Sequence, residues 1–148
     1  MKKPFHSLHA RAFCHTTEDQ TRVRKAMASV LGDVELKVSR TEGHHGNPIE
    51  ILEAVVEDKD LIADFFRRLD PHDLESVADS LASRIDNGCN LFIRLDKQAA
   101  YLGEIKMAAA GDVISVRIKV NAFPARCEIA QTTVKEFLKD LQGRSESH

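Results

Sequence analysis

Two adjacent histidines lie in the least generic segment of the chain, Gly43-His44-His45-Gly46-Asn47-Pro48. Its glycines let the backbone take positive φ angles or approach a ligand closely, which frees amide N–H groups to face an anion. The two imidazole rings can stack on a flat ligand, and the carboxamide can form directional hydrogen bonds with it. We therefore select His44, His45, Gly46 and Asn47 as candidate binding residues.

This histidine loop (residues 43–48) also admits other interpretations. A metal site would use its imidazoles, and a catalytic site would pair a histidine with Cys14 or Glu42. Three more histidines near the N-terminus could join a metal site: His6, His9 and His15. Adjacent histidines, however, tend to point in different directions, and no metal-ligand spacing, nucleophile elbow, H-E-x-x-H motif, P-loop or dinucleotide fingerprint is present. Spacing alone favours a polar hairpin tip, and we predict no metal, no cofactor and no catalytic residue.

Basic side chains recur at the outward positions of several alternating segments. The five are Arg11, Lys37, Arg94, Arg117 and Lys119. Phe13 and Phe92 share their phase, and side chains of one phase on neighbouring strands stand about 5 Å apart on one sheet face. Such a face suits RNA, because cations neutralise phosphates and release counterions while aromatic rings stack on unpaired bases. The competing interpretation is that these charged side chains only keep the solvent-exposed face of a sheet soluble.

Hydrophobic periodicity predicts the elements that position these residues. Period-two alternation predicts strands over residues 6–15, 34–39, 49–56, 89–96 and 113–121, with a further strand over 103–109. Helical spacing predicts helices over 17–32, 58–69, 70–88 and 124–143, and a short helical turn over 97–101. The pattern predicts an α+β fold in which helices pack on one face of a twisted, mostly antiparallel sheet. We expect a single domain over 1–148, with its core at about 5–142 and a frayed tail at 143–148.

Composition fits a soluble globular domain. The chain has 148 residues, of which 43% are hydrophobic and 30% charged, which excludes a disordered, collagen-like or coiled-coil protein. Its three cysteines, Cys14, Cys89 and Cys127, form no C-x-x-C pair, so we expect a reducing compartment and no disulfide framework. No apolar run approaches the ~18 residues of a membrane span, and the N-terminal segment lacks the apolar core of a secretory signal. We predict a cytoplasmic protein with no membrane partner.

The net charge of −2 conceals an uneven distribution. Residues 1–40 carry eight basic and four acidic groups, residues 41–90 carry four and twelve, and residues 91–148 carry nine and seven, which gives +4, −8 and +2. The acidic excess falls on the second hairpin strand and on the helices that follow it. We therefore expect a basic sheet face for RNA and an acidic helical side that is a possible contact for a protein partner.

Three segments resemble an archaeal family of predicted RNA-binding proteins or exosome-associated subunits. They are Glu42-Gly43-His44-His45-Gly46-Asn47-Pro48-Ile49, Arg94-Leu95-Asp96-Lys97-Gln98-Ala99 and Val116-Arg117-Ile118-Lys119, and the resemblance covers about residues 5–142. That family is similar in fold to large-subunit ribosomal protein five. The resemblance implies a non-catalytic RNA-binding protein, and it adds Lys97 and Gln98 as motif positions that could reach the same ligand.

We predict a non-catalytic protein that binds structured or single-stranded RNA, as an accessory to RNA processing, exosome function or ribosome maturation. The predicted RNA-binding residues are Arg11, Lys37, His44, His45, Gly46, Asn47, Arg94, Lys97, Gln98, Arg117 and Lys119. Two alternatives stay open. One is a protein-interaction module that uses the acidic helical side, and the other is a small enzyme or metal-binding protein that uses the histidine loop.

Overall fold

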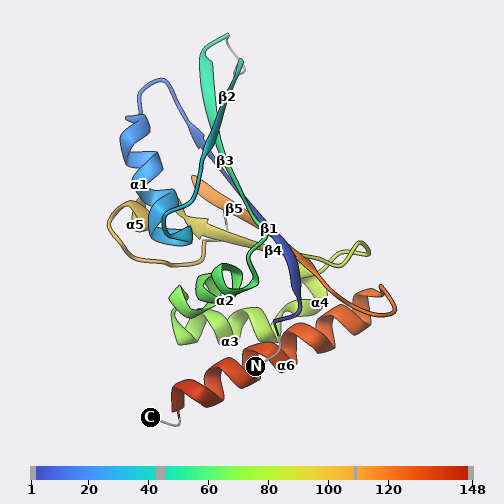
Figure 1. Cartoon of the computed structure of the whole chain (residues 1–148). Helices are drawn as coiled ribbons and strands as arrows, with labels where there is room; N and C mark the ends of the chain where they lie inside the picture. Colours follow the sequence, from blue (N-terminus) through green and yellow to red (C-terminus); the bar gives the residue numbers. More distant parts are fainter. Residues whose placement is uncertain (1–2, 43–45, 109, 147–148) are drawn as a thin grey trace.

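The strands form one antiparallel sheet in the order β2-β3-β1-β5-β4, with β1 at its centre (Figure 1). The computed structural model describes residues 3–42, 46–108 and 110–146. The strands are β1 (Phe5–Cys14), β2 (Lys37–Glu42), β3 (Pro48–Val56), β4 (Asn90–Asp96) and β5 (Val113–Val120). The helices are α1 (Gln20–Leu31), α2 (Lys59–Arg68), α3 (Pro71–Asp79), α4 (Leu81–Arg84), α5 (Lys97–Tyr101) and α6 (Cys127–Glu146). The predicted α+β class is confirmed.

One face of the sheet is covered by the helices and holds the core. Along β1, Leu8 and Ala10 point to this covered face and are buried, as are the residues paired with them on β3 and β5. An irregularity of the strand register after Phe5 lets that ring join the same side. There Phe5 packs on Phe66 of α2 and Phe137 of α6, with ring centroids 5.0 Å and 4.8 Å away. The predicted packing of helices on one face is confirmed.

The other side of the sheet, which we call the open face, carries the second set of alternating side chains. In Figure 1 the helices that the structure describes all lie on the opposite side of the strands. Among the described residues of the strands, none whose side chain points to the open face is buried. The face therefore stays accessible to a ligand along its whole width.

The segments around β4 differ from the sequence prediction. The helix expected over 70–88 is two helices, α3 and α4, which meet at Ser80. The strand expected over 103–109 contributes a single bridge, between Met107 and Leu95. This segment lies along the outer edge of β4 and satisfies backbone groups there, since the Ala108 N–H donates to the Arg94 carbonyl.

None of the described helices is long and apolar enough to cross a membrane.

The hairpin predicted around the histidine loop is confirmed. β2 pairs with β3 from Lys37 opposite Glu53 to Glu42 opposite Pro48. β2 begins at Lys37, three residues after the predicted start. Figure 1 shows that the far end of this hairpin extends beyond the helices.

Candidate nucleic-acid interface

Three of the predicted basic residues lie in one line across the open face. The strand register pairs Lys37 with Glu53, Glu53 with Arg11, Arg11 with Ser115, and Ser115 with Arg94. Neighbouring strands are about 4.8 Å apart, so the three cations recur on every second strand at intervals of about 10 Å. We call Arg94, Arg11 and Lys37 the cation row. It gives the open face a line of positive charge, interrupted by Glu53 between Lys37 and Arg11, that suits a polyanion.

A second line of residues runs beside the cation row, two residues away along each strand. His9 on β1 is paired with Arg117 on β5, which is paired with Phe92 on β4. We call His9, Arg117 and Phe92 the planar row, because an imidazole, a guanidinium and a phenyl ring stand on three adjacent strands. Phe92 is 44% exposed. Flat groups of these three kinds are the ones that stack on nucleobases.

Two arginines of the open face have no partner inside the described part of the protein. Arg11 and Arg117 are exposed, and among the described residues neither guanidinium makes a hydrogen bond or an ion pair. Lys119 lies on the same face, but it is half-buried and its ammonium donates a hydrogen bond to the Gly88 carbonyl. Arg11 and Arg117 can therefore engage a ligand without breaking an existing contact, whereas Lys119 divides its donors between the fold and a ligand.

The open face also carries a second exposed phenyl ring. Phe13 lies two residues beyond Arg11 on β1, on the side of the cation row away from the planar row, and is 40% exposed. An exposed phenyl ring beside cations can stack on an unpaired base. Aromatic rings therefore flank the cation row on both sides.

His9 is the titratable member of the planar row. Burial lowers its pKa from the usual value of 6.5, and the neighbouring Arg117 lowers it further. Two carboxylates, Glu53 and Glu57, act in the opposite direction. The imidazole is therefore mostly neutral at neutral pH, a state in which it can stack on a base and accept or donate a hydrogen bond.

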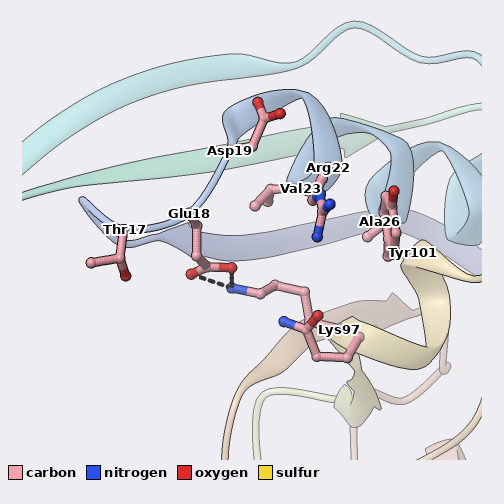
Figure 2. Close-up of a pocket in the computed structure, with 9 residues that line it drawn as sticks. Thr17, Glu18, Asp19, Arg22, Val23, Ala26, Lys97 and Tyr101 are labelled. Carbon is pink, nitrogen blue, oxygen red and sulfur yellow. Dashed lines mark hydrogen bonds and ion pairs between the residues drawn. The ribbon is translucent and has the colours of Figure 1, made fainter.

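Lys97, which the family resemblance adds as a residue that could reach the RNA, lies inside the domain and not on the open face (Figure 2). Its side chain is 2% exposed. The ammonium donates to the Phe13 carbonyl at 2.7 Å and lies 2.8 Å from the Glu18 carboxylate and 2.9 Å from that of Asp112. A buried ammonium needs partners for its three protons, and these three groups supply them. Lys97 thus ties the end of β1 to the start of α1 and to the segment before β5.

Gln98 accompanies Lys97 and not the cation row. It lines a pocket of about 290 Å³ between the start of α1 and α5, and its Nε2 donates to Asp112 at 3.3 Å. Across this pocket the guanidinium of Arg22 lies over the ring of Tyr101, 5.1 Å from its centroid. Gln98 therefore belongs to the helical side of the molecule.

The histidine loop is only partly described. His44 and His45 lie outside the described residues. Gly46 has a φ of 76°, in the left-handed region that glycine adopts readily, and Asn47 is exposed just before β3. β3 runs about 17 Å from its first residue to Glu53 beside the cation row. Gly46 and Asn47 therefore lie at a distance from the two rows that only an extended ligand can bridge.

The structure offers one group of potential metal ligands among the described residues. Ligand atoms of His15, Glu18 and Asp112 lie within 4.8 Å of one another. However, the Lys97 ammonium already contacts both carboxylates and supplies the positive charge that a metal would bring. Nearby, burial and the charge of Glu18 raise the pKa of the Cys14 thiol, so this cysteine is a poor nucleophile.

The acidic middle of the chain is used partly by the fold itself. At the start of α2, Asp58 accepts hydrogen bonds from two backbone N–H groups, and Asp70 accepts one at the start of α3. Asp86 holds the turn before β4 in the same way. Among the described residues of α2–α4, the large apolar side chain that is exposed is Leu61, at 38%. A protein contact normally needs a larger apolar patch than this one.

His9 is the functional candidate that the sequence analysis missed. The sequence assigned this residue only to a possible metal site. Its phase could have identified it, because His9 is two residues before Arg11 and therefore points to the same face of β1. What the sequence does not show is that β5 places Arg117 directly beside it.

Comparison with known proteins relates most of the chain to archaeal proteins. "RNA-binding protein PAB1135" of Pyrococcus abyssi is 36% identical over 144 residues, which cover 90% of this chain and 94% of that protein. Among solved structures, protein AF2318 from Archaeglobus fulgidus has a TM-score of 0.80 at 32% identity, with 89% of this chain and 98% of that chain covered. Mth689 from Methanothermobacter thermautotrophicus has a TM-score of 0.79 at 31% identity, with 90% and 98% covered. Both are described as DUF54 proteins.

A family described as RNA binding matches residues 7–120. This range includes every residue of the cation row and of the planar row, together with the hairpin that carries the histidine loop. The match covers more than half of the chain, and the chain therefore belongs to this RNA-binding family.

Proposed function

We propose that this protein binds RNA on the open face of its sheet. The observation that carries the proposal is that the cation row and the planar row lie side by side on a face that the described helices leave uncovered. Lysine and arginine provide affinity for phosphates by releasing counterions, and flat side chains bind bases. Family membership and the name of the Pyrococcus abyssi relative support the same function.

The residues of the open face take different roles in this proposal. The cation row binds phosphates. Arg117 neutralises a neighbouring phosphate with its charge while the flat side of its guanidinium faces a base. Lys119 adds a weaker contact because its ammonium also donates to the Gly88 carbonyl. For a longer RNA, we also propose contacts with the four residues predicted from the histidine loop: His44, His45, Gly46 and Asn47. Lys97 and Gln98 are left out, because their polar groups are engaged on the helical side.

The proposed role is binding without catalysis. The enzyme alternative pairs a histidine with Cys14 or Glu42. The Cys14 thiol is buried on the covered face and its pKa is raised. It therefore cannot reach an RNA bound across the two rows.

We further propose that RNA binding serves RNA processing, exosome function or ribosome maturation in the cytoplasm. We infer this context from the sequence. The likeness to large-subunit ribosomal protein five and the protein partner on the acidic helices are also inferred from the sequence. Purification of the tagged protein from cells, with and without nuclease treatment, tests the context. Exosome or ribosomal proteins that remain bound after nuclease would support a direct contact, and their loss would leave RNA as the link.

Charge-matched arginine variants test RNA binding itself. Arg11→Gln/Arg117→Gln removes two exposed cations from the open face, and Arg24→Gln/Arg126→Gln removes two exposed arginines elsewhere. Fluorescence anisotropy with a labelled RNA of mixed sequence, over a range of salt concentrations, gives the affinity and its salt dependence. We expect weaker binding by the open-face variant. The slope of log K against log salt should fall by about 1.4, because each phosphate contact to a single strand contributes about 0.7.

The control variant should keep the affinity and the salt slope of the unmodified protein. Equal losses in both double variants would show that net charge alone governs binding, which would overturn the proposed surface. RNA binding that is undetectable at low salt would overturn the proposed function as a whole.

A further inference from the structure

We propose that the planar row is a stacking site for unpaired bases, so that the preferred ligand is single-stranded RNA with about two or three bases held across β4, β5 and β1. This inference rests on the proposed function, because it names the class of RNA that the open face takes. It depends on three further observations about the two rows.

The first observation is the side-by-side placement of the three flat side chains. Phe92 and Arg117 are direct cross-strand partners, as are Arg117 and His9. At about 4.8 Å between strands, the row from Phe92 to His9 spans about 10 Å. Phenyl, guanidinium and imidazole groups all stack on nucleobases. A row of this length with one flat group on each strand accommodates two or three bases.

The second observation is the exposure of the phenyl ring. At 44% exposure, Phe92 offers part of its ring to solvent on a surface that the described helices do not cover. In an RNA duplex each base is already stacked on its neighbours and presents only its edge, together with phosphates and 2′-hydroxyls. A phenyl ring can therefore gain stacking energy only from an unpaired base.

The third observation is the position of the charges relative to the flat groups. The rows are two residues apart along each strand, or about 7 Å. A single strand can therefore place its phosphates along Arg94 and Arg11 while its bases lie over the planar row. Glu53 interrupts the cation row between Arg11 and Lys37, which restricts the most positive part to β4, β5 and β1. This is the same part of the sheet that carries the planar row.

Phe13 offers a second place for a base on the opposite side of the cation row. A strand that passes from the planar row over Arg11 to Phe13 would continue toward the β2–β3 hairpin, since Phe13 is paired with Ile51 of β3. A longer single strand should therefore bind more tightly than one of two or three nucleotides.

Two matched phenylalanine variants test the inference. Phe92→Leu removes the ring from the planar row, and Phe123→Leu removes an 88% exposed ring from the segment between β5 and α6. The probes are a labelled oligoribonucleotide of mixed sequence and the same strand annealed to its complement. Circular dichroism and thermal unfolding establish that both variants are folded. We expect the unmodified protein to bind the single strand more tightly than the duplex.

The Phe92→Leu variant should bind the single strand about tenfold more weakly, the loss expected for one stacked base, and should bind the duplex as before. The Phe123→Leu variant should bind both probes like the unmodified protein. As a second measurement, the ring protons of Phe92 should shift in NMR spectra when the single strand is added, because a stacked base lies over the ring. They should not shift when the duplex is added.

Failure of this inference can be distinguished from failure of RNA binding. The stacking site would be refuted if Phe92→Leu left single-strand binding unchanged or weakened both probes equally, while Arg11→Gln/Arg117→Gln still reduced RNA binding and its salt slope. That result would leave RNA binding on the open face intact. Absence of binding to either probe at low salt would refute both.

Discussion

The two faces of the sheet are built from the same strands but use similar side chains in opposite ways. On the covered face, Phe5 and Phe66 stack in the core and are fully buried. On the open face, Phe13 and Phe92 keep 40% and 44% of their surface exposed. The residue type alone therefore does not tell whether a phenylalanine belongs to the core or to a binding surface. One must also know to which face of the sheet it points and whether helices cover that face.

The same contrast holds for the cations. Lys97 is buried on the helical side, where one carbonyl and two carboxylates accept its three protons. Arg117 is exposed on the open face, and within the described residues its guanidinium makes no hydrogen bond or ion pair. A cation that the fold has already neutralised stabilises the protein, whereas an unsatisfied one can bind a ligand.

The largest effect is expected for the core phenyl rings. Phe66→Ala should lower the free energy of unfolding by about 3–5 kcal/mol, because it removes a ring that packs on both Phe5 and Phe137. Phe92→Ala should lower it by about 1 kcal/mol or less, because 44% of the residue is exposed and the change removes mainly cross-strand contacts. Urea denaturation followed by circular dichroism measures both. A loss of several kcal/mol for Phe92→Ala would show that the open face is part of the core.

The next effect concerns the buried cation. Lys97→Met should lower the free energy of unfolding by about 3 kcal/mol, because it leaves Glu18 and Asp112 without their shared partner. Arg117→Met should be nearly neutral for stability and should weaken RNA binding. Urea denaturation and anisotropy with labelled RNA on both variants give the two effects. If Lys97→Met kept full stability but lost RNA binding, Lys97 would be a binding residue and not a structural one.

A smaller effect tests how the acidic residues are used. Asp58→Ala should lower the free energy of unfolding by about 1 kcal/mol, since its carboxylate accepts hydrogen bonds from two N–H groups at the start of α2. Glu57→Ala, one residue earlier and also exposed, is the matched control and should cost less than about 0.5 kcal/mol. Thermal or urea unfolding compares the two. If both variants lowered the free energy of unfolding equally little, the fold would not need the Asp58 carboxylate. That carboxylate would then be available to contact a protein partner.

Much of the open face could be predicted from the sequence, because alternation within one strand determines which side chains share a side. The phase of β1 separates Arg11 and Phe13 from the buried Leu8, and the phase of β4 separates Phe92 and Arg94 from Leu91. These placements need no knowledge of other strands. The binding roles of the residues stay predictions.

The alignment of residues on different strands could not be predicted, because it depends on strand order and register. β1 pairs with β3 and β5, which follow it by more than 30 residues in the chain, so no local pattern places Arg117 beside His9. Lys97 is a different case. It continues the inward phase of Leu91, Ile93 and Leu95, so the sequence carried a signal for its burial, but not for its distant partners.

The smallest effect is expected for the protonation of His9, which should change the stability of the protein and its RNA affinity in opposite directions. Burial and Arg117 hold the pKa of His9 below its usual value of 6.5 in the folded protein, so the unfolded chain takes up a proton first as the pH falls. The free energy of unfolding should therefore decrease as the pH falls from about 6.5 toward the lower pKa of the folded state. One proton accounts for at most about 1.4 kcal/mol per pH unit.

RNA binding should show the opposite sign over the same pH range. The phosphates proposed along Arg11, about 7 Å from His9, favour the imidazolium, so the complex takes up a proton and the affinity should rise as the pH falls. His9→Gln should remove both slopes, while His72→Gln, an exposed histidine on α3, should remove neither. Urea unfolding and RNA anisotropy at about pH 7.5 and about pH 5.5 measure the two signs. If lower pH weakened RNA binding through His9, no phosphate would lie beside the planar row, and the path proposed for the RNA backbone along Arg94 and Arg11 would have to move away from this histidine.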